Sequence, residues 1–172
     1  MSELSDEITI RGKKIRNRIV MPPMMCFSFK GDNGGRYGEQ HVNHYTQRAK
    51  GGTGLIIIQA TPVGGAEKQL GVWSDEQMKP LKAIAQNCHN YGSTVMMQLY
   101  CEDENVNEIS ASQIHTMQVD CIAASAIAKQ AGFDGVEYHF AHGYTLCRFL
   151  DPISNQRKDN PIILCSAKIV VS

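Results

Sequence analysis

The sequence predicts an α/β fold made of parallel β/α units, and three observations support this prediction. Strand-like and helix-like patterns alternate along the 172 residues. The run Leu55 to Ile58 is continuously apolar, which is typical of a strand that is buried on both faces. Each long helical pattern ends at a glycine, namely Gly51, Gly92 or Gly132, and the next strand pattern follows at once.

The chain begins with a predicted hairpin and a short strand. Residues 8–15 form two apolar runs that turn at Gly12, and this hairpin could close the floor of a barrel. A strand over residues 18–21 must end at Pro22 and Pro23, because proline cannot donate a ladder hydrogen bond. The following loop, residues 29–38, is glycine-rich and polar, which suits either a mobile flap over an active site or an ordinary surface loop.

Three helical patterns and three strands follow. The first helix is predicted over residues 40–50, with Val42, Tyr45 and Ala49 on one stripe. A capping box at residues 74–77 opens a second helix that runs to about Tyr91. The remaining elements are a strand at 94–99, a helix at 112–131 and a strand at 136–140. In the helix at 112–131, five residues are predicted on or near one face, namely Ile114, Met117, Cys121, Ile122 and Ala128.

Composition excludes several classes of protein. The 17 basic and 17 acidic residues give no net charge, so nothing favours nucleic acid or an anionic membrane surface as a partner. No apolar run approaches the roughly 20 residues that span a bilayer, and the acidic start does not resemble a signal peptide. The 6 cysteines lack C-x-x-C or zinc spacing, which argues against a disulfide framework or a metal site. A soluble protein of the cytoplasm is therefore expected.

The segment 135–144 is the strongest candidate for chemistry. An apolar strand pattern ends there in His139, His142 and Tyr144. Two imidazoles beyond a strand end can donate hydrogen bonds to a developing oxyanion, and a tyrosine hydroxyl can supply a proton. A pair of structural histidines or a metal site would show the same spacing, so the spacing alone leaves these alternatives open.

Four ordered segments resemble one family. They are residues 16–24 (RNRIVMPPM), 54–60 (GLIIIQA), 95–99 (VMMQL) and 131–159, which includes GFDGVEYHFAHGY. The chain resembles the old yellow enzymes, which are FMN-dependent NADH:flavin oxidoreductases and ene-reductases, over about residues 8–159. The resemblance implies a single domain over residues 1–172, a partial (β/α)8 TIM barrel with about four amino-terminal β/α units after a short β-hairpin. Complete barrels have about 250 residues, so only the amino-terminal half is matched, and residues 160–172 diverge.

The resemblance also implies a cofactor, a reaction and a set of site residues. FMN would take electrons from NADH or NADPH and pass hydride from N5 to a polarised alkene. His139 and His142 would polarise the substrate carbonyl, and Tyr144 would donate the proton. Phe27 would line the substrate site. The expected cofactor contacts are Pro22, Pro23, Met24, Met25, Ala60 and Gln98.

The sequence also departs from the family pattern. Met25 stands where many relatives have a redox-tuning cysteine, and Cys26 is displaced by one position away from the flavin. Phe27 replaces a tyrosine. The family's phosphate-binding loops come from its second half and are not found here. Residues 162–164 could form a fifth strand that pairs with one edge of the sheet and covers it.

Three hypotheses follow from these departures. Two half barrels could pair as a homo-oligomer that completes the enclosure. The chain could instead be a truncated, inactive relative that cannot hold FMN. It could also be an interaction module that pairs with another barrel protein through its exposed edges.

Overall fold

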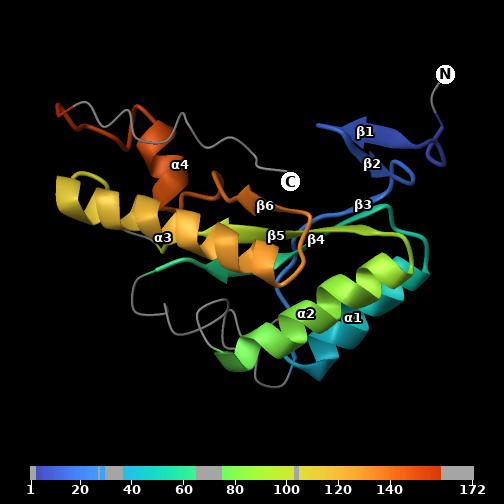
Figure 1. Ribbon diagram of the computed structural model, residues 1–172. Helices are drawn as coiled ribbons and strands as arrows, with labels where there is room; N and C mark the ends of the chain where they lie inside the picture. Colours follow the sequence, from blue (N-terminus) through green and yellow to red (C-terminus); the bar gives the residue numbers. More distant parts are fainter. Residues whose placement is uncertain (1–2, 27, 30–36, 65–74, 103–104, 160–172) are drawn as a thin grey trace.

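A computed structural model describes residues 3–26, 28–29, 37–64, 75–102 and 105–159. Its elements alternate as the sequence predicts (Figure 1). In chain order they are β1 (Ile8–Ile10), β2 (Lys13–Ile15), β3 (Val20–Met21), α1 (Glu39–Lys50), β4 (Leu55–Pro62), α2 (Asp75–Asn90), β5 (Thr94–Tyr100), α3 (Ala111–Gln130), β6 (Gly135–Tyr138) and α4 (Thr145–Leu150). The predicted flap, Ser74 of the second capping box and the predicted fifth strand fall largely or wholly outside the described residues.

The central sheet has four parallel strands in the order β3-β4-β5-β6. Val20 pairs with Leu55, Leu55 with Thr94, and Met96 with Gly135, so neighbouring strands follow each other in the chain. This arrangement confirms the prediction of four β/α units, and β3 and β6 form the two edges of the sheet. The first strand is shorter than predicted, because only Val20 and Met21 pair before the prolines.

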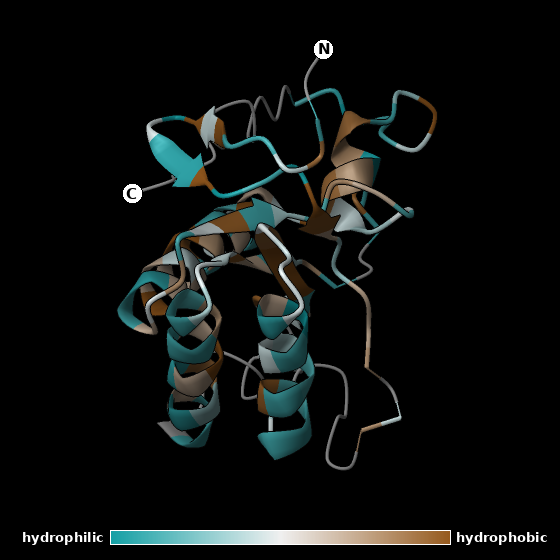
Figure 2. Cartoon of the chain, turned by 90° about the vertical axis from the view of Figure 1, so that its right-hand side faces the viewer, coloured by the Kyte–Doolittle hydropathy of each residue, from teal (hydrophilic) through white to brown (hydrophobic). Residues whose placement is uncertain are grey.

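Both faces of the sheet are covered, which explains the continuous apolar run of β4. Ile56 and Ile58 are fully buried on the face that packs against the helices. Leu55 and Ile57 point the other way and form a second cluster with Ile15 of the hairpin. Figure 2 shows α1 and α2 side by side, with largely hydrophilic outer turns below a mainly hydrophobic sheet. The hairpin therefore closes the floor, as the sequence predicts.

The polar residues before β3 hold this floor together and do not line the cavity described below. The Arg16 guanidinium donates hydrogen bonds to the Ala49, Thr53 and Tyr91 carbonyl oxygens, at 2.8, 3.0 and 2.6 Å. A Cβ on Gly54 would lie 2.7 Å from the carbonyl oxygen of Asn17, so only glycine fits there. The turns before β4 and β5 are thus fixed by one arginine.

Two details of α3 differ from the sequence prediction. Ile122 is 70% exposed, so its assignment to the packed face was wrong. The buried stripe runs through Ile114, Cys121, Ala124 and Ala128, and a residue one position after Cys121 is rotated about 100° away from it. The helix begins one residue earlier than predicted, after a capping box in which the Ser110 hydroxyl oxygen accepts a hydrogen bond from the Gln113 amide.

Other boundaries shift by one or two residues. The last strand ends at Tyr138 instead of Phe140, because the chain turns after His139. The Gln77 carboxamide oxygen accepts a hydrogen bond from the Tyr37 amide, which connects the first turn of α2 to the segment just before α1.

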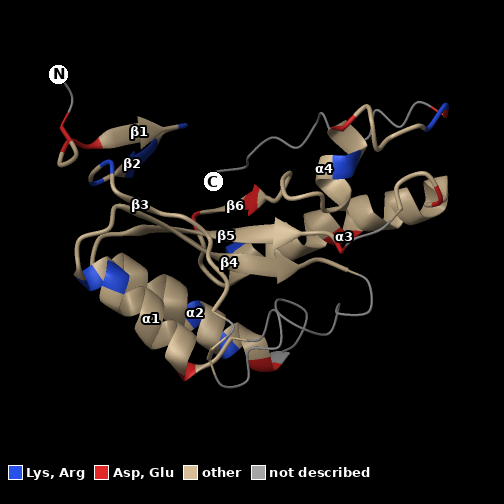
Figure 3. Ribbon diagram, turned by 180° about the vertical axis from the view of Figure 1, so that it is seen from behind, with Lys and Arg blue, Asp and Glu red and all other residues tan. Residues whose placement is uncertain are grey.

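Basic and acidic residues are interspersed over the described helices and the hairpin (Figure 3). None of the described helices combines the length and apolar character needed to cross a membrane.

Candidate active site

The carboxyl ends of all four parallel strands line one cavity of about 970 Å³. Every predicted site residue within the described part of the chain contributes to its lining. These residues are Pro22, Pro23, Met24, Met25, Ala60, Gln98, His139, His142 and Tyr144. Phe27, predicted to line the substrate site, lies outside the described residues. Residues that are up to 122 positions apart in the sequence are therefore brought together by the parallel topology.

The segment after β3 forms one wall of the cavity. The Cys26 amide donates a hydrogen bond to Oε1 of Gln59 at 2.9 Å, which fixes the end of this segment to β4. Cys26 is 8% exposed and is not among the residues that line the cavity, whereas Met24 is 63% exposed. The structure thus places Met25, and not Cys26, at the wall.

Ala60 sits at an irregularity of β4. The pairing register between β4 and β5 shifts between Ile58 and Thr61, so Gln59 and Ala60 leave the regular ladder. The Gln59 amide donates to the Tyr45 hydroxyl oxygen at 3.0 Å, and the Tyr37 hydroxyl lies 2.6 Å from Oγ1 of Thr61. Two tyrosines therefore satisfy the polar groups beside the irregularity and fix the position of Ala60 in the cavity.

Gln98 of β5 is paired with a carboxylate. Its Nε2 donates a hydrogen bond to Oε1 of Glu137 at 2.6 Å, and the two residues are direct partners in the β5–β6 register. Gln98 is 6% exposed, so its carboxamide is held away from bulk solvent. The bond to Glu137 fixes the orientation of the carboxamide, because a carboxylate can only accept hydrogen bonds from the amide nitrogen.

The two histidines and the tyrosine lie on the turn after β6. The His139 amide donates to the Leu99 carbonyl oxygen at 2.8 Å, so His139 is still aligned with β5. His142 and Gly143 then adopt positive φ angles of 58° and 77°, which turns the chain back over the strand end. As a result His139 Nε2 lies 3.2 Å from His142 Nδ1. The Tyr144 ring lies 5.3 Å from the His139 ring between centroids.

The environment of His139 favours its neutral form. Burial lowers the pKa of His139, His142 beside it lowers it further, and Glu137 opposes the change only in part. At neutral pH the imidazole therefore acts as a neutral donor or acceptor. Such a group can polarise a carbonyl through an N–H bond without placing a fixed positive charge in the cavity.

Five further residues that line the cavity were not among the predicted site residues; they are Tyr100, Glu137, Tyr138, Phe140 and Ala141. The Tyr100 ring lies 5.4 Å from that of Tyr144 between centroids and extends the aromatic wall. Strand periodicity could have identified Tyr100, because residues two apart in a strand share a face and Gln98 was already assigned. The same periodicity places Glu137 on the face of His139, but the bond between Glu137 and Gln98 depends on the register between two strands.

Comparison with known proteins decides the family. The model of the NADH:flavin oxidoreductase / NADH oxidase family matches residues 3–108 and 101–161. The chain belongs to this family. The NADPH dehydrogenase of Listeria welshimeri is 36% identical over 185 aligned positions, which include 93% of this chain and 54% of that protein. The NADPH dehydrogenase of Bacillus subtilis is 32% identical over 182 positions, with 91% and 54% covered.

Solved structures of this family share the fold. The old yellow enzyme from Pichia sp. AKU4542 superimposes with a TM-score of 0.79 at 26% identity, over 91% of this chain and 50% of that one. An old yellow enzyme homologue from Zymomonas mobilis gives 0.80 at 25% identity, over 92% and 54%. These matches confirm the partial TIM barrel, and the chain spans about half the length of the relatives that it matches.

The cavity fits one part of the family's FMN. The segment Pro22 to Met25, the small side chain of Ala60 and the carboxamide of Gln98 suit a flat ring system with a polar edge. A phosphate needs basic side chains or free backbone amides. Among the described residues that line this cavity none is Lys or Arg. The residues present therefore fit the isoalloxazine ring, and the phosphate would have to be bound by groups from elsewhere.

Proposed function

We propose that the chain acts in an FMN-dependent, NAD(P)H-driven reduction of polarised alkenes of the old yellow enzyme type. The observation that carries the proposal is the convergence of all four strand ends on one cavity. Each of these ends contributes a residue that the family resemblance predicts. When bound there, FMN would supply hydride from its ring. The protein then has to orient the ring and polarise the substrate.

Gln98 and Glu137 orient the ring in this proposal. Nε2 of Gln98 is held by Glu137, so the carboxamide oxygen is the group that would accept a hydrogen bond from the pyrimidine edge of FMN. Ala60 leaves room for the ring to approach β4, and residues 22–25 offer backbone along its side. These contacts select a planar heterocycle with one N–H donor at its edge.

His139, His142 and Tyr144 act on the substrate. N–H groups of the two imidazoles would donate to the carbonyl oxygen and draw electrons from the alkene, which makes its β-carbon electrophilic. The hydrogen bond between His142 Nδ1 and His139 Nε2 must be exchanged for hydrogen bonds to the substrate. Such a hydrogen bond contributes only about 0.5–1.5 kcal/mol to stability. The Tyr144 hydroxyl would give its proton to the α-carbon and regain one from solvent.

A second copy of the chain would complete the enclosure. In the described sheet β3 and β6 each pair on one side only, which leaves two open parallel edges. If β6 of each copy pairs with β3 of the other, the two four-stranded sheets join into a closed barrel of eight strands with two-fold symmetry.

The Tyr144→Phe variant tests the assignment of the proton donor. We expect alkene reduction by the reduced flavoprotein to slow by about 10²–10⁴-fold, because a positioned acid contributes that much. Reduction of the flavin by NADPH should not change. Tyr91→Phe, which alters a 42% exposed tyrosine away from the cavity, is the matched control. Both half-reactions are followed by anaerobic stopped-flow absorbance, and an equal loss in both would refute the role of Tyr144.

A further inference from the structure

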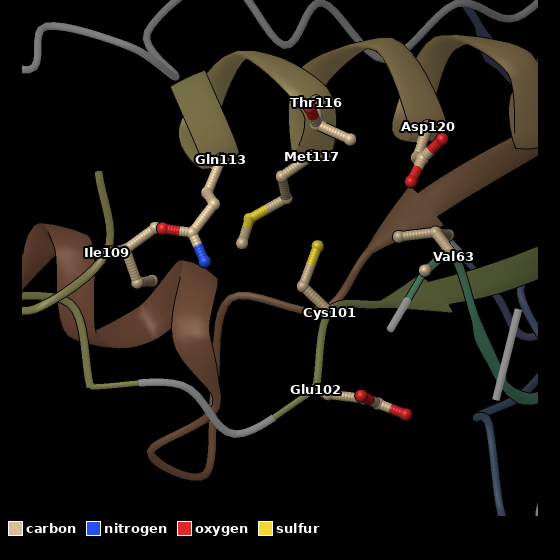
Figure 4. A pocket seen from close by; sticks show the side chains of 9 residues that line it. Val63, Cys101, Glu102, Ile109, Gln113, Thr116, Met117 and Asp120 are labelled. Carbon is tan, nitrogen blue, oxygen red and sulfur yellow. The ribbon is translucent and has the colours of Figure 1, made fainter. Parts of the chain in front are cut away.

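A second, smaller cavity of about 170 Å³ lies on the other side of the β5 end, against α3. It shares no lining residue with the cavity of the strand ends. Figure 4 shows Cys101 and Met117 turned toward each other across this space, with Gln113 on the same helix and Glu102 below. The space is large enough for a molecule of a few heavy atoms, because one water needs about 30 Å³.

Two thiols meet at this cavity. Sγ of Cys101, directly after β5, lies 3.8 Å from Sγ of Cys121 on α3, although the two residues are 20 positions apart. Cys101 is 2% exposed and Cys121 is 6% exposed. A disulfide has sulfur atoms about 2.05 Å apart, so the sulfurs need to approach by about 1.8 Å. Rotation about the Cα–Cβ bonds can supply such a change.

The pKa values of the two thiols are shifted in opposite directions. The hydrogen bond from Cys101 lowers the pKa of Cys121. The same hydrogen bond, together with burial and the nearby charges of Cys121 and Asp120, raises the pKa of Cys101. One thiol of the pair is therefore poised to ionise before the other, and the proton between them can move along the hydrogen bond. A thiolate is the form that reacts with oxidants.

We propose that Cys101 and Cys121 form a peroxide-sensitive dithiol that closes to an internal disulfide. Cys101 lines the cavity, so hydrogen peroxide in the cavity reaches the pair of thiols from that side. The Cys121 thiolate attacks one peroxide oxygen, the O–O bond breaks, and Cys121 sulfenic acid and, after proton uptake, one water form. Cys101 then attacks the sulfenic sulfur of Cys121, and a second water leaves. In total two thiols and one peroxide give one disulfide and two waters.

The disulfide would connect the end of β5 to the middle of α3. Cys101 follows Tyr100, whose ring contacts Tyr144, and the Thr145 hydroxyl donates to the Glu102 carbonyl oxygen. Oxidation would therefore fix the strand end that carries one wall of the larger cavity. This proposal does not depend on flavin binding or on any activity of the chain.

The test treats the folded full chain with about one equivalent of hydrogen peroxide and maps its disulfides by mass spectrometry without reduction. Cleavage after Tyr91 and Glu102 places Cys88, Cys101 and Cys121 on separate peptides. We expect the intact mass to fall by two hydrogens, most of the disulfide to join Cys101 to Cys121, and dithiothreitol to reverse the change. The same treatment in guanidinium chloride should abolish this preference, because unfolding separates the sulfurs.

Three variants complete the test. Cys101→Ser and Cys121→Ser should each lose the disulfide, whereas Cys147→Ser should retain it at the wild-type rate. Oxygen added to Met117 or to Cys101 without a cross-link would overturn the proposal. A cross-link between other cysteines would also overturn it. Because the wild-type chain gives the decisive map, the result does not depend on the folding of any variant.

Discussion

Removing one hydroxyl group, in Tyr45→Phe, should measurably destabilise the protein. Tyr45 is fully buried, and its hydroxyl oxygen accepts a hydrogen bond from the Gln59 amide at 3.0 Å. Burial raises the pKa of Tyr45 far above its usual range, so the group remains a neutral phenol at every pH of interest. Phenylalanine keeps the ring and its packing but removes the acceptor.

The magnitude follows from the cost of an unsatisfied buried donor. The Gln59 amide would lose its hydrogen bond to the Tyr45 hydroxyl oxygen at the irregularity of β4. Such a loss costs about 1–3 kcal/mol. With a denaturant dependence of about 2 kcal/mol per molar urea, the unfolding midpoint should fall by about 0.5–1.5 M.

The assay is equilibrium unfolding in urea, followed by circular dichroism. Tyr91→Phe makes the same chemical change at a tyrosine that is 42% exposed, and its midpoint should stay close to that of the wild type. If the two variants show the same midpoint, the hydrogen bond to Gln59 contributes nothing and the account of how Ala60 is positioned fails.

Two further predictions concern the floor of the barrel. Gly54→Ala should destabilise the protein by about 2 kcal/mol or more, since its Cβ would clash with the Asn17 carbonyl, whereas Gly51→Ala should change little; thermal unfolding compares them. Burial alone would raise the pKa of Asp134, but hydrogen bonds from Lys13, the Val95 amide and His89 outweigh it and lower the pKa. Its contribution to stability is then complete above about pH 4 and is lost as pH falls through the lowered pKa. Between pH 5 and pH 2 the free energy of unfolding should therefore fall less steeply in Asp134→Asn than in the wild type. The same slope in both proteins would contradict this reasoning.

Much of the fold could be predicted because its signals are local. The apolar run of β4, the glycines that follow α1, α2 and α3, and the prolines after β3 each depend on a few neighbouring residues. The parallel topology then brings the strand ends together without further information. For this reason the candidate site residues of β4, β5 and β6 could be expected at one place before any coordinates were known.

The remaining features depend on contacts between distant segments. The Gln98–Glu137 bond needs the register of β5 and β6, and the Tyr45–Gln59 bond needs α1 to lie on β4. Neither has a signal in the spacing of residues. The error at Ile122 has a local cause, because it lies one position from a buried residue and apolar character alone did not reveal its rotation on the helix.

Titration of the purified chain with FMN tests the central claim most directly. Quenching of flavin fluorescence would be followed together with light scattering, which gives the mass of the species that binds. The account predicts saturable binding at micromolar or lower concentration by a species of twice the 19.0 kDa chain mass. If flavin fluorescence remains unquenched at all protein concentrations, the cavity of the strand ends does not hold FMN and the proposed function is wrong.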